Sequence, residues 1–344
     1  MRRRIQWATA TAVAALLGTS GLVATGAVEE ASAALRLNEI QVLGSHNSYK
    51  LAMPADNFAA LKASNPATAE SLFYWHLPLD EQLDLGIRKV ELDVFYDPDG
   101  SLFPGVAEES GSQFPVLHVQ NLDTRSSCAN LLRCLEALRT WSDAHPEHIP
   151  VFISFNAKDQ VIDRPGFLRP LPFDEDAWAA LDGEITAVLG DRLIRPESVV
   201  RNGRPEWPLL DEVRGGFVAI LDEGGDKRAT YASRWAARAM FANLPETAAG
   251  AAILIINDPV AEFDRIQRLV RQGFIVRTRA DADTREARSG DTTRREAAFA
   301  SGAQLISTDY YLPARHFGTD YVVDLPGRYR CNPLLRAGDC QLLE

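Results

Sequence analysis

The chain has 344 residues, of which 46% are hydrophobic and 24% charged, a globular composition that excludes a collagen-like, disordered or coiled-coil protein. Lys and Arg number 36 against 47 Asp and Glu, which gives a net charge of -11. Because nucleic-acid binders of this size carry a basic surplus that matches the phosphates, this balance argues against nucleic acid as a partner. It also argues against strong electrostatic docking on anionic membranes, and it suits a chain that holds a cation.

The first 33 residues have the pattern of a signal peptide. Arg2, Arg3 and Arg4 precede a stretch rich in Ala, Leu and Val, and Ala31-Ser32-Ala33 supplies small residues at the spacing that signal peptidase recognises. A membrane anchor is the alternative, but Thr, Ser and Gly dilute the apolar stretch. We therefore expect a signal peptide over residues 1–33 and a secreted, mature chain over residues 34–344.

Export predicts that the cysteines are oxidised. There are four of them, Cys128, Cys134, Cys331 and Cys340, and they allow three pairings. We favour the local pairs Cys128–Cys134 and Cys331–Cys340, since each closes a short loop at little entropic cost. Six residues on an unbroken helix rise about 9 Å, so the first pair requires the chain to bend there. A zinc site is the alternative, but neither pair has CxxC spacing.

Short apolar runs alternate along the chain with longer amphipathic stretches. The runs, which predict buried parallel strands, are residues 40–43, 89–95, 115–119, 150–155, 217–221, 253–256, 274–277 and 304–306. The stretches between them that predict helices include residues 126–144, 174–189, 260–272 and 292–301.

Eight strands with helical connections in about 300 residues predict a single-domain (β/α)8 TIM barrel. A doubly wound sheet is the rival fold, but the GxGxxG fingerprint is absent after the first strand. Residues 52–76 form a long insertion after the first strand, and we expect the tail after Pro313 to wrap the barrel.

On such a barrel the chemistry belongs at the C-terminal ends of the strands, where polar residues follow nearly every predicted run. Glu91 and Asp93 are two residues apart, so a strand points both carboxylates to the same face. Two buried carboxylates repel each other unless a cation lies between them. With Asn47 from the neighbouring strand they form an all-oxygen ligand set that favours Ca2+ or Mg2+ over zinc. The alternative is a salt bridge from Lys89, which shares the face of Glu91 and would leave Asp93 without a partner.

His46 and His118 follow or end separate predicted strands and could converge on one substrate group. A divalent cation beside two histidines suits phosphodiester cleavage, because the cation stabilises charge on phosphorus and an imidazolium protonates the leaving oxygen. The other histidines, which we predict to be surface or packing residues, are His76, His145, His148 and His316.

Several motifs, taken in order, resemble those of phosphoinositide-specific phospholipase C, and in particular its secreted, calcium-dependent bacterial type. They are Gly44-Ser45-His46-Asn47-Ser48-Tyr49, Pro78-Leu79-Asp80-Glu81-Gln82-Leu83-Asp84-Leu85-Gly86-Ile87-Arg88, Glu91-Leu92-Asp93 and Leu117-His118. The resemblance covers most of the mature chain and is strongest over residues 40–127.

The resemblance implies that His46 and His118 are the catalytic pair and that Asn47, Glu91 and Asp93 bind Ca2+. The inositol 2-hydroxyl then attacks the adjacent phosphorus, which yields a cyclic inositol phosphate and diacylglycerol. In this scheme Glu91 accepts the hydroxyl proton, His118 protonates the departing glycerol oxygen, and His46 contacts a phosphoryl oxygen.

Further site residues are also implied by the resemblance. Arg279 and Tyr310 are expected to hold the inositol ring or its phosphates, and Lys158, which follows the fourth predicted strand, is a further candidate for binding substrate. Eukaryotic relatives place a glutamate as fourth metal ligand where this chain has Asn156. Either Asn156 or Asp222 would fill that role here, and the lower ligand charge predicts weaker Ca2+ binding.

The expected partners are a phosphatidylinositol-type substrate and, transiently, a membrane surface, and we expect a monomer. Phe73-Tyr74-Trp75 is either a ridge that dips into lipid or a cluster packed beneath its own loop.

Two other functions stay open. Glycerophosphodiester phosphodiesterases share the barrel, the histidines and the Glu-x-Asp ligands, but they usually open with His-Arg-Gly where this chain has His46-Asn47-Ser48. The second alternative is a secreted binding barrel that has lost its catalysis, which the intact pair of histidines argues against.

Overall fold

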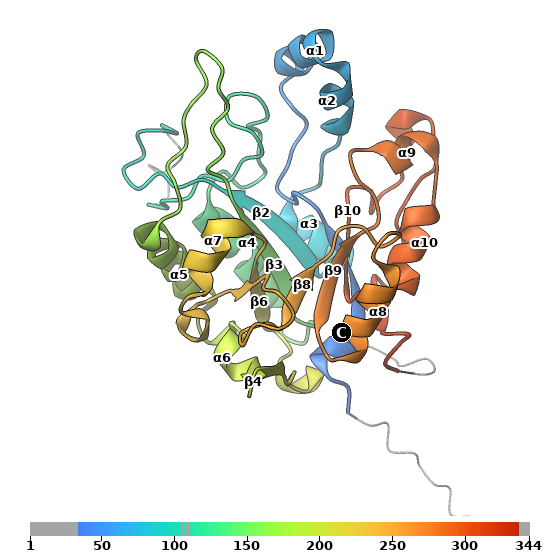
Figure 1. The fold of residues 1–344 in the computed structure, drawn as a ribbon. Coiled ribbons are helices and arrows are strands. Elements are labelled where there is room, and N and C mark those ends of the chain that lie inside the picture. Colours follow the sequence, from blue (N-terminus) through green and yellow to red (C-terminus); the bar gives the residue numbers. More distant parts are fainter. Residues whose placement is uncertain (1–33, 105, 107–110, 337–344) are drawn as a thin grey trace, which may run out of the picture. The chain divides into compact units, whose positions relative to one another are not determined.

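The computed structural model describes residues 34–104, 106 and 111–336. Eight parallel strands form a nearly closed barrel in the order β7-β6-β3-β2-β1-β10-β9-β8 (Figure 1). The strands are β1 (Ile40–Ser45), β2 (Lys89–Val94), β3 (Val151–Ala157), β6 (Phe217–Leu221), β7 (Phe241–Ala242), β8 (Ile253–Ile255), β9 (Ile275–Arg279) and β10 (Leu305–Thr308). The prediction of a (β/α)8 TIM barrel is therefore confirmed.

One predicted strand is wrong. Residues 115–119 do not join the barrel as a parallel strand, but form isolated antiparallel bridges, including Val94 with Val116. No helix lies among the described residues between β2 and this run, and a parallel return needs a long crossover connection. The eighth position belongs instead to the two-residue strand β7, which is too short to be recognised as an apolar run.

Helices connect the strands and cover the outside of the barrel. They are α3 (Leu79–Asp84), α4 (Leu131–Ala144), α5 (Glu175–Leu189), α6 (Pro196–Val199), α7 (Gly225–Ala232), α8 (Phe263–Arg271), α9 (Arg285–Ser289) and α10 (Thr293–Ala300). Side-chain caps set two of the starts, because Asn130 accepts a hydrogen bond from the Arg133 amide and Asp174 from the Ala177 amide. The long insertion folds into α1 (Ala55–Ser64) and α2 (Pro66–Ser71), which rise above the barrel next to β1 (Figure 1).

The first cysteine pair is confirmed. Cys128 and Cys134 form a disulfide with 5.1 Å between their Cα atoms. Because α4 begins at Leu131, Cys128 precedes the helix, and the bend that the pairing requires lies at the cap. The second expected pair includes Cys340, which lies outside the described residues.

The barrel interior changes from apolar to charged along the strands. Near their N-terminal ends, inward side chains such as Val42, Phe152, Val218 and Leu305 belong to one buried apolar cluster. Toward the C-terminal ends the inward residues become Glu91, Asp93, Asn156, Asp222 and Arg277. Every second residue of a strand points into the barrel, so the same inward face supplies the apolar core at one end and the polar cavity at the other.

Two further contacts complete the barrel. No ladder joins β7 to β8 within the described part of the chain, but the Ile255 amide donates to Asn243 Oδ1 at 3.0 Å and spans the gap. The tail returns to the barrel as predicted, and its strand β11 (Tyr329–Cys331) pairs antiparallel with the first half of β1. Among the described residues, no helix is long and apolar enough to cross a membrane. The signal-peptide prediction concerns residues 1–33, which lie outside the described residues.

Candidate active site

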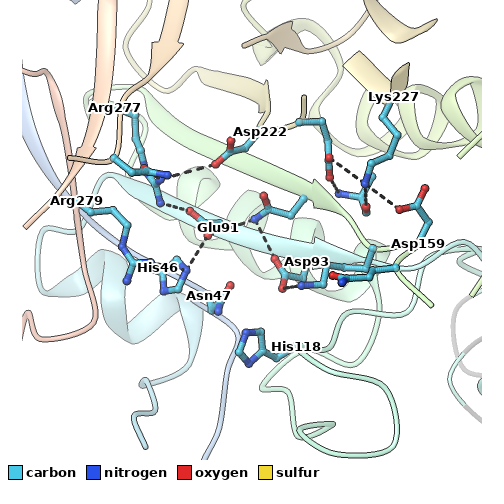
Figure 2. Close-up of a pocket in the computed structure, with 16 residues that line it drawn as sticks. His46, Asn47, Glu91, Asp93, His118, Asp159, Asp222, Lys227, Arg277 and Arg279 are labelled. Carbon is cyan, nitrogen blue, oxygen red and sulfur yellow. Dashed lines mark hydrogen bonds and ion pairs between the residues drawn. The ribbon is translucent and has the colours of Figure 1, made fainter. Parts of the chain in front are cut away.

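A cavity of about 410 Å3 opens at the C-terminal ends of the strands (Figure 2). The fold brings almost every predicted site residue to its wall. These are His46, Asn47, Glu91, Asp93, His118, Asn156, Lys158 and Arg279, together with Asp222. Tyr310 is the exception, because it lies in a neighbouring cavity of about 190 Å3 and packs against His316, Phe317 and Tyr321.

His46 lies just beyond β1 and is oriented by an aspartate. Its Nδ1 is 2.8 Å from Asp309 Oδ1, so its Nε2 faces the cavity, 3.3 Å from Arg279 Nη1 and 3.5 Å from Glu91 Oε1. Burial and then the charge of Arg279 lower the pKa of His46, although Asp309 and Glu91 oppose the shift. The lowered pKa favours the neutral imidazole, whose Nε2 faces the cavity and lies at hydrogen-bond distance from Arg279.

His118 has a matching arrangement. Its Nδ1 is 2.9 Å from Asp123 Oδ2, and the same carboxylate oxygen is 3.3 Å from the buried Lys50 Nζ. A turn in which the Val119 and Asp123 backbones pair brings Asp123 back beside the histidine. The site thus holds two His–Asp pairs, and sequence reasoning assigned neither aspartate to a histidine. The spacing of five residues between His118 and Asp123 is the one local signal that could have indicated a pair.

Tyr74 of the insertion reaches into the site between the two histidines. Its ring centroid is 5.9 Å from that of His46 and 6.5 Å from that of His118. Asn47 Nδ2 donates to its hydroxyl at 2.7 Å, and Asn47 itself has a left-handed backbone with φ 48°. Tyr74 therefore fixes the amide of Asn47, and its ring lines the adjoining cavity rather than the active-site cavity.

His76, which we predicted to be a packing or surface residue, supports the site from behind. It is buried, and its Nε2 lies 2.7 Å from the backbone oxygen of His46. Burial lowers the pKa of His76 to about 4, so this ring stays neutral and donates one hydrogen bond to the backbone of His46.

Both inward carboxylates are already paired with cationic side chains. Glu91 Oε2 lies 2.5 Å from Lys89 Nζ and 2.7 Å from Arg277 Nη2, and all three residues are buried. Although burial opposes it, the charges of Lys89 and then Arg277 hold the pKa of Glu91 well below its usual value. The alternative in which Lys89 forms a salt bridge with Glu91 is thus realised, and Arg277 adds to it from β9, which β1 and β10 separate from β2.

Asp93, which sequence reasoning left without a basic partner, has one. Lys158 Nζ lies 3.1 Å from its Oδ2. Asn156 donates its amide to Asp93 Oδ1 at 3.0 Å and to Glu91 Oε1 at 3.3 Å, and so bridges the two carboxylates. Repulsion between Glu91 and Asp93 is therefore relieved by side chains of the protein itself.

The residues expected to bind Ca2+ have suitable chemistry. Asn47, Glu91, Asp93 and Asn156 line one cavity, and amide and carboxylate oxygens are the donor types that suit a hard cation. Asn156 points its amide nitrogen at both carboxylates, so its side chain would have to turn to offer its oxygen. Within the described ranges, no group of three or more His, Cys, Asp or Glu side chains is arranged to hold a metal ion. A bound cation would share its carboxylates with Lys89, Arg277 and Lys158, which indicates weak binding.

The far end of the cavity is predominantly acidic. Lys227 Nζ lies 3.0 Å from Asp159 Oδ1 and 2.9 Å from Glu223 Oε2, at the end away from His46 (Figure 2). Asp222 Oδ2 is 3.7 Å from Arg277 Nη1, and burial raises the pKa values of Asp222 and Glu223. Arg277 and Arg279, by contrast, lie beside Glu91 and His46 respectively.

Comparison with protein families matches residues 35–333 to the model described as "Phosphoinositide phospholipase C, Ca2+-dependent". Among solved structures, the chain is similar to a calcium-dependent phosphoinositol-specific phospholipase C from a Pseudomonas sp. in its myoinositol complex. The identity is 16% and the TM-score 0.54, over 86% of this chain and 95% of that one. It is also similar to a Ca2+-dependent phosphatidylinositol-specific phospholipase C from Streptomyces antibioticus, with 17% identity and a TM-score of 0.53 over 83% of this chain and 98% of that one. These two likenesses show the fold. No curated protein matches the chain significantly.

Proposed function

Because this chain belongs to the Ca2+-dependent phosphoinositide phospholipase C family, whose members are phosphoric diester hydrolases, we propose that it cleaves phosphatidylinositol to diacylglycerol and a cyclic inositol phosphate. The observation that carries the proposal is a pair of histidines in one polar cavity, each oriented by its own aspartate. Such a pair can remove one proton and supply another across a single phosphodiester.

His46 is the stronger candidate for accepting the proton of the 2-hydroxyl. A general base must be unprotonated, and the lowered pKa keeps His46 neutral at pH 7. Glu91, to which the sequence assigned this role, is a weaker base because two cations hold its pKa well below the usual value. In this mechanism Glu91 instead holds the side chains of Arg277 and Lys89 in place beneath the site of the phosphate.

His118 is proposed as the acid that protonates the departing glycerol oxygen. Asp123 accepts a hydrogen bond from Nδ1 and leaves the Nε2 proton free for transfer. Arg279 and Lys158 would contact the phosphoryl oxygens, where their charges stabilise the negative charge that develops in the transition state.

Ca2+ is proposed as a cofactor held by Asn47, Glu91, Asp93 and Asn156. When bound, it supplies positive charge beside the phosphoryl oxygens. Because three cationic side chains already neutralise the two carboxylates, we expect the site to bind Ca2+ weakly. The higher calcium concentration outside the cell would then be needed to fill it. Secretion, which the first 33 residues predict, is part of the same proposal, as is transient contact with a membrane.

The test is phosphorus NMR of the products formed from phosphatidylinositol with and without Ca2+. We expect inositol 1,2-cyclic phosphate, whose formation stops on chelation. Release of glycerol phosphate from glycerophosphodiesters, with no cyclic product, would support the phosphodiesterase alternative instead. His118→Ala should lower the rate by a factor of about 100–10,000. His145→Ala, a matched change outside the cavity, should not.

The pH profile separates His46 from Glu91 as the base. With His46, kcat/KM falls on acidification through an apparent pKa below 6.5, because the base becomes protonated. With Glu91, whose pKa lies well below 4.5, no such acid limb would appear down to about pH 5.

A further inference from the structure

Donors of the protein itself contact all four carboxylate oxygens of Glu91 and Asp93. Two buried cations hold Glu91 Oε2, and the Asn156 amide donates to Glu91 Oε1 and to Asp93 Oδ1. Lys158 Nζ lies 3.1 Å from the remaining oxygen, Asp93 Oδ2. A cation that approaches these carboxylates from the cavity therefore meets a protein donor at every oxygen, and the question is which donor gives way.

The two cations on Glu91 are fixed in the barrel interior. Lys89 is fully buried, and its Nζ also donates to the backbone oxygen of Ser45 at 3.2 Å and to Ser307 Oγ at 3.3 Å. Arg277 is only 2% exposed, and it also donates to the side chains of Asn257 and Ser307. Moving either side chain away from Glu91 would leave a buried charge without its partner, which is strongly unfavourable. Neither cation can therefore make room for a metal ion.

Lys158 is held less firmly than these two cations. Its side chain is 31% exposed, and Asp93 is its one salt-bridge partner in the part of the chain that the structure describes. Its backbone is anchored, because the Lys158 amide donates to the Val94 carbonyl at 2.8 Å. A long, flexible side chain on a fixed backbone, partly in contact with water, can leave Asp93 while its ammonium stays hydrated. Of the three cations, Lys158 is therefore the one that can move.

Asn156 is the second donor that can rearrange. Its Nδ2 lies 3.0 Å from Asp93 Oδ1 and 3.3 Å from Glu91 Oε1, and the side chain is part of the cavity wall. A turn of the amide group replaces these N–H donors by the side-chain oxygen, and no charge has to move. Both donors that contact Asp93 can therefore give way, Lys158 by swinging aside and Asn156 by turning.

The Lys158 ammonium and a divalent cation exclude each other at Asp93. Protein oxygens lie about 2.3–2.6 Å from a bound Ca2+, so a cation on this carboxylate would lie close to the ammonium that is 3.1 Å from Oδ2. The two positive charges repel each other at such a separation, and more strongly in a protein cavity than in bulk water. Binding of Ca2+ by Asp93 is therefore coupled to the departure of Lys158.

We propose that Lys158 is an exchangeable counter-ion, which pairs with Asp93 in the calcium-free protein and leaves it when Ca2+ binds. The released ammonium stays at the wall of the same cavity, where it is available to an anionic substrate. The inference rests on the proposed function for the metal and for the phosphodiester. It adds that the calcium-free protein keeps Lys158 away from a substrate phosphate, so that loading with Ca2+ supplies the charge of the metal and frees the charge of the lysine.

Calorimetric titration of the full chain with Ca2+, in the absence of substrate, tests the competition. Lys158→Met keeps the length of the side chain and removes its charge, so it should bind Ca2+ at least about tenfold more tightly than the wild type. Lys158→Arg restores a cation and should return the affinity toward the wild-type value.

Lys227→Met is the matched control. It removes the same charge from the same cavity, but Lys227 lies at the far end, where it pairs with Asp159 and Glu223 (Figure 2). Because the Coulomb energy falls with distance, Lys227→Met should tighten Ca2+ binding by less than about threefold. The comparison separates a direct competition at Asp93 from a general effect of net charge.

Lysine acylation gives a second measurement, on the unaltered chain. A dilute acylating reagent labels accessible amines, and mass spectrometry gives the rate at Lys158 relative to that at Lys62, which is exposed on α1. Saturating Ca2+ should raise the relative rate at Lys158 severalfold over the rate in a chelator, because the ion pair with Asp93 no longer holds the ammonium back from the reagent. The relative rate at Lys227 should stay the same.

Equal Ca2+ affinity in the wild type and in Lys158→Met would overturn the inference and leave the proposed function standing. Equal tightening in Lys158→Met and Lys227→Met would overturn it as well, as would acylation of Lys158 that does not respond to Ca2+. Failure of the wild type and of every variant to bind Ca2+ would refute it together with the calcium part of the proposed function. Competition between Lys158 and Ca2+ in a chain that forms no cyclic inositol phosphate would refute the proposed function and support the inference.

Discussion

Glu91→Gln tests the ion-pair cluster at the centre of the barrel. The change removes the carboxylate charge that lies 2.5 Å from Lys89 Nζ and 2.7 Å from Arg277 Nη2, and it leaves the shape of the side chain unchanged. Asp222, 3.7 Å from Arg277 Nη1, remains as a more distant partner. Breaking a buried pair by removing one partner costs about 3–5 kcal/mol, because the remaining charge stays out of water. Two cations lose the same partner here, so we expect the upper end of that range, a large part of the 5–15 kcal/mol of a typical domain.

Lys89 limits the cost. Burial, opposed by Glu91, already lowers its pKa to about 8, so without Glu91 the ammonium can lose its proton instead of staying charged. Lys89→Met alone should cost less than Glu91→Gln, because Glu91 keeps Arg277. The double variant Glu91→Gln/Lys89→Met no longer contains the unpaired Lys89 ammonium. Its loss of unfolding free energy should therefore be smaller than the sum of the two single losses by at least about 1 kcal/mol.

Urea denaturation followed by circular dichroism gives these free energies. Glu136→Gln is the matched control, since Glu136 forms an exposed pair with Arg133, and it should cost less than about 1 kcal/mol. Because the folded-state pKa of Glu91 is lowered, its contribution is present above about pH 4.5 and is lost as the pH falls below that. The difference between wild type and Glu91→Gln should therefore shrink in acid. If the losses of unfolding free energy of Glu91→Gln and Lys89→Met add up to that of the double variant within about 0.5 kcal/mol, the reasoning is refuted.

Three further predictions concern residues around the site. Asp123→Asn should lower kcat about a hundredfold or more with little change in KM, because His118 loses the carboxylate that fixes its tautomer; an unchanged kcat in steady-state assays would contradict this. Burial and the neighbouring Asp309 raise the pKa of Asp281 to about 7, so its contribution to stability is present below about pH 4 and is lost as the pH rises through about 7. In Asp281→Asn the melting temperature should therefore fall less between about pH 4 and pH 7 than it does in the wild type. A Cβ at Gly44 would lie 2.5 Å from Lys89 Cβ, so Gly44→Ala should cost about 1–3 kcal/mol or more in thermal denaturation, whereas Gly183→Ala, in open space on α5, should not destabilise.

The sequence was informative where a pattern is local. The alternation of side chains along a strand placed Glu91 and Asp93 on one face, and the position of each apolar run predicted which polar residues end at the mouth of the barrel. The same reasoning failed for residues 115–119, because an apolar run does not indicate whether its strand pairs parallel or antiparallel with its neighbour. The resemblance placed Tyr310 in the site, but after β10 this residue lies in the adjoining cavity.

By itself, then, the sequence determined the barrel, the end at which its chemistry lies, the disulfide at Cys128 and most of the residues that line the cavity. Tertiary structure decided what those residues contact. Arg277 meets Glu91 across 186 positions of sequence, and Asp309 meets His46 across 263. Closure of the barrel sets such partners, because it brings the ends of distant strands to one cavity. A local pattern of side chains cannot show which residues far apart in the sequence will meet there.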